Sequence, residues 1–75
     1  MPGRDERAQN RAKAPSILSR HGVSFSVHNE GAHIVIEDVH TVDFWPGPAL
    51  WIWRGAPDEQ RYGIDNLLKF LGRAV

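Results

Sequence analysis

Histidine is the residue type in this chain best suited to acid–base chemistry, because its side chain changes charge near neutral pH. The four histidines are His21, His28, His33 and His40. No two of them have the i, i+4 spacing of a helical zinc site, and the sequence has no HExxH stretch, nucleophile elbow or phosphate-binding loop. A Cys–His pair is excluded because the chain has no cysteine. We therefore predict no metal site and no cofactor.

His33 is the histidine with the sharpest functional interpretation. It follows Gly31 and Ala32, and a histidine beside small residues on an open sheet suits general acid–base catalysis of RNA cleavage. The competing interpretation is an ordinary polar-face histidine. His28 is expected to face His33 across a hairpin, with Glu37 further along the second strand. These three side chains lack the full ligand spacing for zinc, and a solvent-facing cluster is the more common arrangement.

Alternating apolar and polar residues predict the strands that position these histidines. The inward positions follow a period of two and are Val23, Phe25 and Val27; Ala32, Ile34 and Ile36; Val42 and Phe44; and Leu50 and Ile52. Asn29 and Gly31 lie in a turn where positive φ is expected. The segment 46–49, Pro-Gly-Pro-Ala, forces a further reversal. The pattern indicates three or four antiparallel strands joined as a meander.

A helix is predicted on each side of the strands. Residues 6–14 favour helix by composition, and Pro15 either kinks one long helix or starts a second one. This first helical region should end just before Gly22, which suits the left-handed stop of a helix. The second helix shows the i, i+3, i+4, i+7 spacing of an apolar stripe at Ile64, Leu67, Leu68 and Leu71.

Two terminal helices can cover only one face of a small sheet, so the opposite face is expected to stay open. Strict alternation assigns all three tryptophans to that face. Trp and Arg are enriched among binding hot spots, and a large exposed aromatic patch marks a contact surface. The predicted binding residues are Trp45, Trp51, Trp53, Arg54, His28 and Asp43. The alternative is a bulge at residues 46–48, because a one-residue slip reverses every facing and buries one or two tryptophans.

Composition limits the class of protein. The chain has 75 residues, 41% of them hydrophobic, no cysteine and a formal net charge of zero, which fits one small domain and excludes a large multi-domain enzyme. Its apolar runs are too short for a membrane span, no secretion signal is recognisable, and the lack of cysteine fits a reducing cytoplasm. Because a chain of this size buries only a thin core, a partner or self-association is an expected source of added stability.

Charge is unevenly distributed along the chain. Residues 1–20 carry five basic and two acidic side chains, residues 21–60 carry one basic and six acidic, and residues 61–75 carry three basic and one acidic. Proteins that bind nucleic acid gain affinity from clustered Lys and Arg, whereas the strand region here is acidic. A protein partner or a second copy of the chain is therefore favoured over nucleic acid.

The order of elements, with a Gly-x-His at the start of the second strand, resembles the HicA-type toxin family. The matching residues are Ile17-Leu18 with His21-Gly22, Gly31-Ala32-His33, the short strand ending in Pro46, and the helix from Gly63 to Leu71. The resemblance spans residues 15–72 in layout. It implies a fold like that of double-stranded-RNA-binding domains and mRNA cleavage supported by a histidine at His33. The chain departs from the toxin pattern in its acidic strands and in Pro48, which stiffens the turn.

A second resemblance is to small uncharacterised proteins of phages and prophages. Its motifs here are Asn-Glu-Gly-Ala-His at 29–33, Asp-Phe-Trp-Pro-Gly at 43–47, Leu-Trp-Ile-Trp-Arg at 50–54, and the helix from Gly63 to Leu71. The match covers most of residues 15–71. It implies a phage-borne gene acting in the cytoplasm of a bacterial host, and it implies no established activity.

These observations together predict a flexible terminus over residues 1–7 and a single α+β domain over residues 8–75, with both helices packed on one face of a three- to four-stranded antiparallel sheet. The leading functional hypothesis is a non-catalytic module that uses the open aromatic face. It binds a phage or host protein, such as a host defence component, or a second copy of itself as a homodimer. The alternative is a HicA-like RNA-binding protein or mRNA interferase that uses His33.

Overall fold

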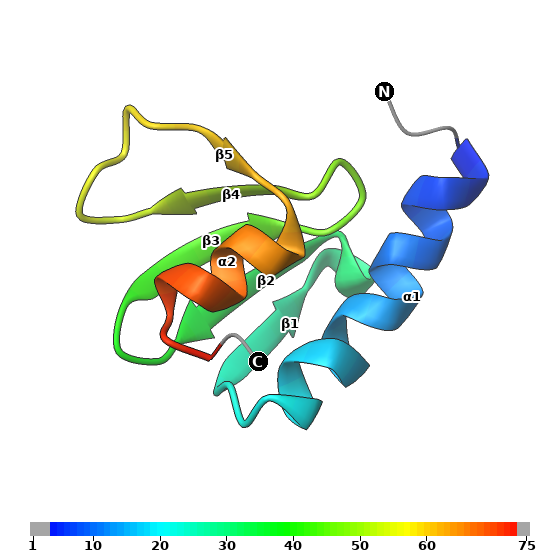
Figure 1. Cartoon of the computed structure of the whole chain (residues 1–75). Coiled ribbons are helices and arrows are strands. Elements are labelled where there is room, and N and C mark those ends of the chain that lie inside the picture. The colour runs from blue at the N-terminus through cyan, green and yellow to red at the C-terminus, as the bar shows by residue number, and fades with distance from the viewer. Residues whose placement is uncertain (1–3, 74–75) are drawn as a thin grey trace.

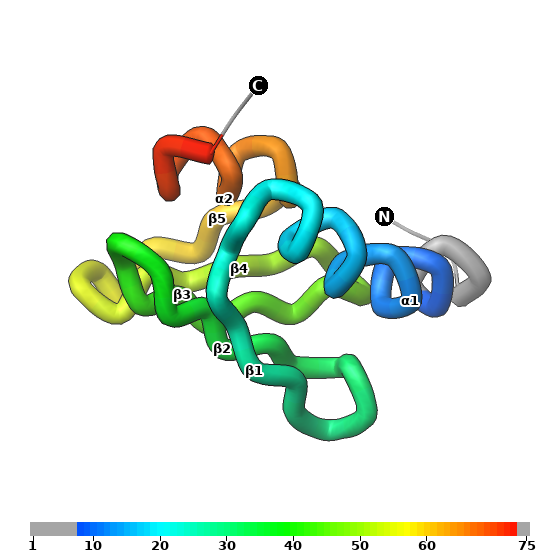
Figure 2. The backbone as a smooth tube through the Cα atoms, turned by 90° about the horizontal axis from the view of Figure 1, so that it is seen from below, coloured from blue at the N-terminus to red at the C-terminus, as the bar shows by residue number. Residues whose placement is uncertain are grey.

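The computed structural model describes residues 4–73, with side chains from residue 8 onwards. Its elements in chain order are α1 (Arg4–Arg20), β1 (Phe25–His28), the 3-10 turn η1 (Asn29–Gly31), β2 (His33–Glu37), β3 (Thr41–Trp45), β4 (Leu50–Trp53), β5 (Arg61–Tyr62) and α2 (Ile64–Phe70). The five strands form one antiparallel sheet in chain order. Both helices lie on the same side of it (Figure 1 and Figure 2). The predicted α+β class is confirmed, with β5 as an additional short strand.

Helix α1 is one continuous helix with Pro15 inside it. Pro15 has no N–H to donate to the carbonyl four residues earlier, so packing must sustain the helix here. Ala14 and Leu18, one turn apart, supply that packing and are buried against the sheet. Gly22 ends the helix as predicted, with φ of 73° and a hydrogen bond from Val23 N to Leu18 O of 3.0 Å. Of the predicted flexible terminus, residues 1–3 lie outside the described part of the chain, whereas the backbone of residues 4–7 belongs to α1.

The register between β3 and β4 corrects the predicted facing of two tryptophans. Trp51 pairs with Phe44 and Trp53 pairs with Val42, so both indoles lie on the helix-covered face. Trp51 is 2% exposed, and Trp53 is partly buried against the core. The prediction that Trp51 and Trp53 point away from the core is therefore wrong.

The turn between these strands explains the change of register. Trp45 pairs with Leu50 across the four-residue turn 46–49, so these two residues share a face. Ala49 takes a left-handed φ of 62°, and its N–H donates to Pro46 O at 3.1 Å. Counting alternation straight through the turn places Leu50 inward, but the turn reverses that parity. Burying Trp51 in place of Leu50 also removes the larger apolar surface from water.

The core lies between the sheet and the two helices. Its buried members are Ala14, Leu18, Val23, Ile34, Ile36, Val42, Phe44, Trp51, Leu67, Leu68 and Leu71. The predicted apolar stripe is confirmed, because Leu67 and Leu68 of α2 and Leu71 directly after it are buried, and Ile64 is partly buried beside them. The polar end of Trp51 is satisfied, because Nε1 donates to Gly63 O at 3.1 Å. No described helix is both long enough and apolar enough to cross a membrane.

An ion pair ties the end of the described chain to the turn between β2 and β3. Arg73 donates through Nε and a terminal nitrogen to the two Asp38 oxygens at 3.0 and 2.8 Å. Hydrogen bonding from Arg73 holds the pKa of Asp38 below its ordinary value of 3.8. A carboxylate with a depressed pKa stabilises the folded state above its unfolded pKa, and that contribution is lost as the pH falls toward the folded pKa.

We expect the Asp38→Asn variant to melt a few degrees below the wild type at pH 7. The gap between the two melting temperatures should narrow as the pH falls from about 5 to about 2, because the wild type loses the ion pair over that window. Thermal unfolding followed by circular dichroism across this range measures both effects. Asp58→Asn, in an exposed loop, is the matched control. A gap that is independent of pH would contradict the assignment to this ion pair.

Candidate functional site

The sheet face opposite the helices, called here the open face, collects most of the polar chemistry of the strands. Cross-strand partners share a face, and the register therefore places these residues together: Ser26, His28, His33, Val35, Glu37, Thr41, Asp43, Trp45, Leu50, Ile52 and Tyr62. Arg54 follows β4 and reaches the same face through Asp43. Of the predicted site residues, this face brings together His28, His33, Asp43, Trp45 and Arg54.

His33 is held on two sides. Its Nε2 lies 3.0 Å from Asp43 Oδ1, and its ring stacks on Trp45 with centroids 4.9 Å apart and an interplanar angle of 7°. The contact to Asp43 is diagonal across the strand pair, because Asp43 is paired with Val35. With its side chain 23% exposed, His33 remains accessible from solvent. It is therefore an oriented histidine and differs from an ordinary polar-face residue.

Asp43 determines which nitrogen of His33 carries the proton. The Arg54 guanidinium donates to both carboxylate oxygens, at 3.0 and 3.1 Å. That hydrogen bonding is the main reason why the pKa of Asp43 is lowered from its ordinary value, and the His33 hydrogen bond acts in the same direction against partial burial. The ionised carboxylate accepts a hydrogen bond from Nε2–H, so Nδ1 of a neutral His33 ring is free to accept a proton.

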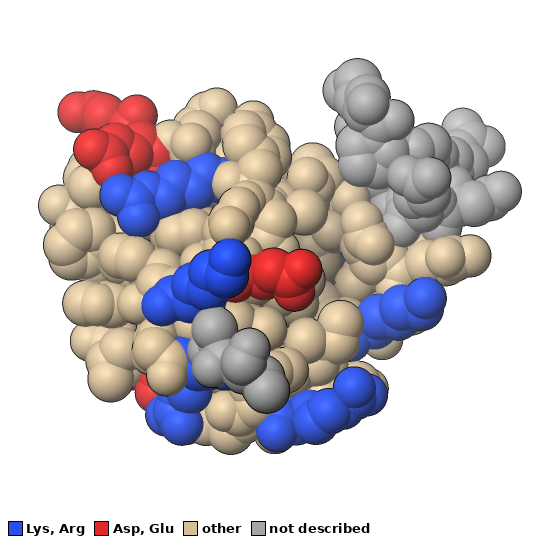
Figure 3. Space-filling view, in the orientation of Figure 1, with Lys and Arg blue, Asp and Glu red and all other residues tan. Residues whose placement is uncertain are grey.

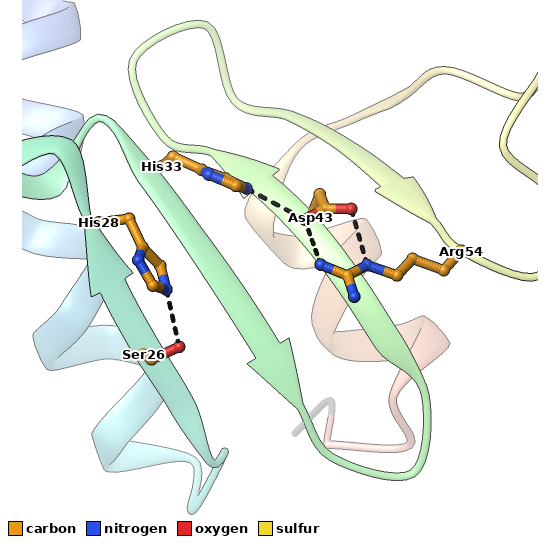
Figure 4. A network of polar contacts seen from close by, with 5 residues as sticks. All are labelled: Ser26, His28, His33, Asp43 and Arg54. Carbon is orange, nitrogen blue, oxygen red and sulfur yellow. Dashed lines mark hydrogen bonds and ion pairs between the residues drawn. The ribbon is translucent and has the colours of Figure 1, made fainter.

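Arg54, Asp43 and His33 form a continuous line of polar contacts from β4 to β2 (Figure 4). The bidentate geometry gives Arg54 a fixed direction, and the same contact raises the pKa of Arg54. The Arg54 side chain is 55% exposed, so a cation lies on the surface beside the oriented histidine.

His28 completes the polar cluster from the neighbouring strand. Its ring centroid is 5.8 Å from that of His33, and its Nε2 lies 3.1 Å from Ser26 Oγ (Figure 4). The η1 turn sets this pairing, since Asn29, Glu30 and Gly31 all have positive φ and return the chain so that His28 lies opposite His33. Positive φ at Asn29 and Gly31 was predicted, and the facing of the two histidines is confirmed. Among the described residues, no group of three His, Cys, Asp or Glu side chains is placed to hold a metal ion.

The other half of the open face is apolar. Its residues Val35, Trp45, Leu50 and Ile52 are each partly buried. Tyr62 is 55% exposed beside them. Alternation along the sequence assigned Leu50 and Ile52 to the helix-covered face, because the face of β4 depends on how the 46–49 turn reverses the chain. Tyr62 lies in a two-residue strand that carries no alternation signal, so only its pairing with Leu50 places it here.

The helix-covered side lacks a continuous basic surface. Figure 3 shows its Lys and Arg side chains separated by uncharged surface, and acidic groups accompany several of them. Arg61 pairs with Glu59, and Arg73 pairs with Asp38. The described part of this side therefore offers no continuous basic track for a phosphate backbone.

Comparison of the chain with protein-family models, with curated proteins and with solved structures finds no match. The chemistry of the open face is consequently the basis for assigning a function.

Proposed function

We propose that the open face binds single-stranded RNA and cleaves it, with His33 as the general base. The observation that carries the proposal is the oriented pair of histidines. His33 is fixed by Asp43 with Nδ1 as an acceptor, and His28 lies 5.8 Å away on the adjacent strand. Two histidines at this separation can act on opposite sides of one phosphate, with one removing a proton and the other supplying one.

The reaction needs only groups of the open face and the RNA itself. His33 Nδ1 removes the proton of a ribose 2′-hydroxyl, and the 2′-oxygen then attacks the adjacent phosphorus. The bond between phosphorus and the 5′-oxygen of the next nucleotide breaks, and protonated His28 donates a proton to that oxygen. The products are a 2′,3′-cyclic phosphate and a 5′-hydroxyl. Arg54 acts as a positioning residue, because it holds the Asp43 carboxylate that orients His33.

The structure weakens the main argument for the aromatic binding face and the main argument against RNA. Trp51 belongs to the core and Trp53 packs against it, so the aromatic patch of the open face is reduced to Trp45 and Tyr62. Asp43, an acidic residue that argued against a phosphate ligand, is neutralised by Arg54 and orients the base. Glu37 remains as an exposed acidic side chain of this face.

The sequence resemblances agree with this proposal. The HicA-type resemblance places its catalytic histidine at His33, the residue that Asp43 orients. The phage resemblance adds the proposal that the protein acts in the cytoplasm of a bacterial host, where messenger RNA is the available single-stranded substrate.

The direct test is incubation of the purified chain with a single-stranded RNA of mixed sequence at low salt, where phosphate contacts are strongest. We expect fragments that end in a 2′,3′-cyclic phosphate and a 5′-hydroxyl. The same oligonucleotide with 2′-O-methyl riboses should remain intact, because it has no attacking hydroxyl. Intact RNA, or fragments with any other ends, would contradict the proposed reaction.

A second candidate function is protein binding by the apolar half of the open face. Val35, Leu50 and Ile52 together with Trp45 and Tyr62 form an uncovered surface that contains the residue types enriched in interface hot spots. In this case the chain is either a homodimer or a binder of a phage or host protein. Light-scattering mass of the same sample separates the two forms, and a dimer that does not cleave RNA would favour this candidate.

A further inference from the structure

A groove adjoins the His33 site at the end of the open face, between α1 and the 46–49 turn. It has a volume of about 390 Å³, and the described residues that line it are Arg11, Ala32, Trp45, Gly47, Pro48 and Leu50. Asn10 of α1 donates to Gly47 O at 3.1 Å, which fixes the helix against the turn that forms one wall. The groove is therefore built from three separate parts of the chain held in place by packing and a hydrogen bond.

The groove is continuous with the oriented histidine. Trp45 lines the groove and also stacks on His33, and Ala32 precedes His33 in the chain. A ligand group in contact with Trp45 is therefore separated from His33 by a single side chain. Apart from the Arg11 side chain, the described lining consists of apolar groups and glycine.

This combination of groups matches one part of a nucleotide chain. A base has two flat apolar faces and stacks on aromatic side chains regardless of its identity. A volume of about 390 Å³ lies in the range of small-molecule sites. We infer that this groove holds the base of a nucleotide next to the cleaved phosphate, stacked against Trp45. This inference rests on the proposed function and adds the subsite that positions the substrate.

The inference is tested by binding, so that cleavage does not enter the measurement. The probes are short 2′-O-methyl RNA oligonucleotides in which one position at a time lacks its base. Affinity at low salt is measured for the wild type, for Leu50→Ala and for Ile52→Ala. Leu50 lines the groove, whereas Ile52, on the same strand and face, does not. Circular dichroism establishes that each variant is folded.

We expect removal of one particular base to weaken wild-type binding by roughly tenfold, as for the loss of a stacked base. Leu50→Ala should weaken binding of the complete oligonucleotide and should reduce the effect of removing that base. Ile52→Ala should leave the tenfold effect in place. This coupling assigns the base to the groove, because Leu50 lines the groove and Ile52 does not.

Two different outcomes would overturn the inference. If RNA binds but no single base matters, or if Leu50→Ala and Ile52→Ala behave alike, the groove holds no base and RNA cleavage by His33 is unaffected as a proposal. If none of the oligonucleotides binds at low salt, the groove inference and the RNA-binding part of the proposed function are both wrong.

Discussion

Replacing His33 with alanine is expected to reduce RNA cleavage by about 10²- to 10⁴-fold, the usual contribution of a general acid–base residue. The fold should survive, because His33 is a partly exposed polar residue outside the core. Asp43 keeps its bidentate contact with Arg54 in the variant, so no buried charge is left unpaired. Initial cleavage rates at low salt and thermal unfolding of the same samples measure the two effects separately.

Two further variants define what the His33 result means. His21→Ala removes a histidine at the end of α1, where Nδ1 lies 2.9 Å from Ile17 O, and should cleave at the wild-type rate. Asp43→Asn keeps the size of the side chain but removes the charge that selects the His33 tautomer, so its cleavage should fall as well. Wild-type cleavage by folded His33→Ala would show that the activity belongs to another group or to a contaminant.

Local signals predicted the elements of this fold. Gly22 ends α1, the leucine spacing identifies α2, and positive φ at Asn29 and Gly31 closes the first hairpin. Each of these features depends on residues only a few positions apart, where conformational preference and helical period act directly. Pro15 is the local signal that left two interpretations open, and packing of the helix against the sheet decided between them.

Long-range pairing determined what alternation alone left open. A period of two assigns faces within one strand, but a turn carries that assignment to the next strand only if its length and backbone conformation are known. The left-handed Ala49 in the 46–49 turn sets the parity for β4, and this moves Trp51 into the core and Leu50 onto the open face. The five-stranded sheet likewise depends on β5, whose two residues are too few to show a period.

The candidate site shows the same division between local and long-range information. His33 was identified from its glycine-flanked position, and its facing with His28 followed from the hairpin turn. Its contact with Asp43 depends on the register between β2 and β3 and on a diagonal approach, which no spacing along the chain encodes. The acidic strand region, which contains Asp43, consequently argued against RNA, whereas the position of Asp43 makes it the group that orients the base.

The register of β4 leads to the second prediction with a large effect. Trp51→Ala should lower the free energy of unfolding by about 3–5 kcal/mol, as is usual for truncation of a buried aromatic residue. It removes a side chain that is 2% exposed and leaves Gly63 O without its hydrogen bond from Nε1. A domain of 75 residues has a total stability of about 4–11 kcal/mol. We therefore expect a fall in Tm of at least about 12 °C or a largely unfolded protein.

Leu50→Ala is the matched control, because the alternation argument and the structure make opposite predictions for this neighbouring pair. In the predicted register Leu50 faces the core and Trp51 faces solvent, so the leucine variant would be the more damaging one. In the structure Leu50 lies partly buried on the open face, and its truncation should cost about 1 kcal/mol. Urea unfolding of both variants measures the difference. If the leucine variant were less stable than the tryptophan variant, the assignment of β4 side chains to the two faces of the sheet would be wrong. The set of residues assigned to the open face around His33 would then be wrong as well.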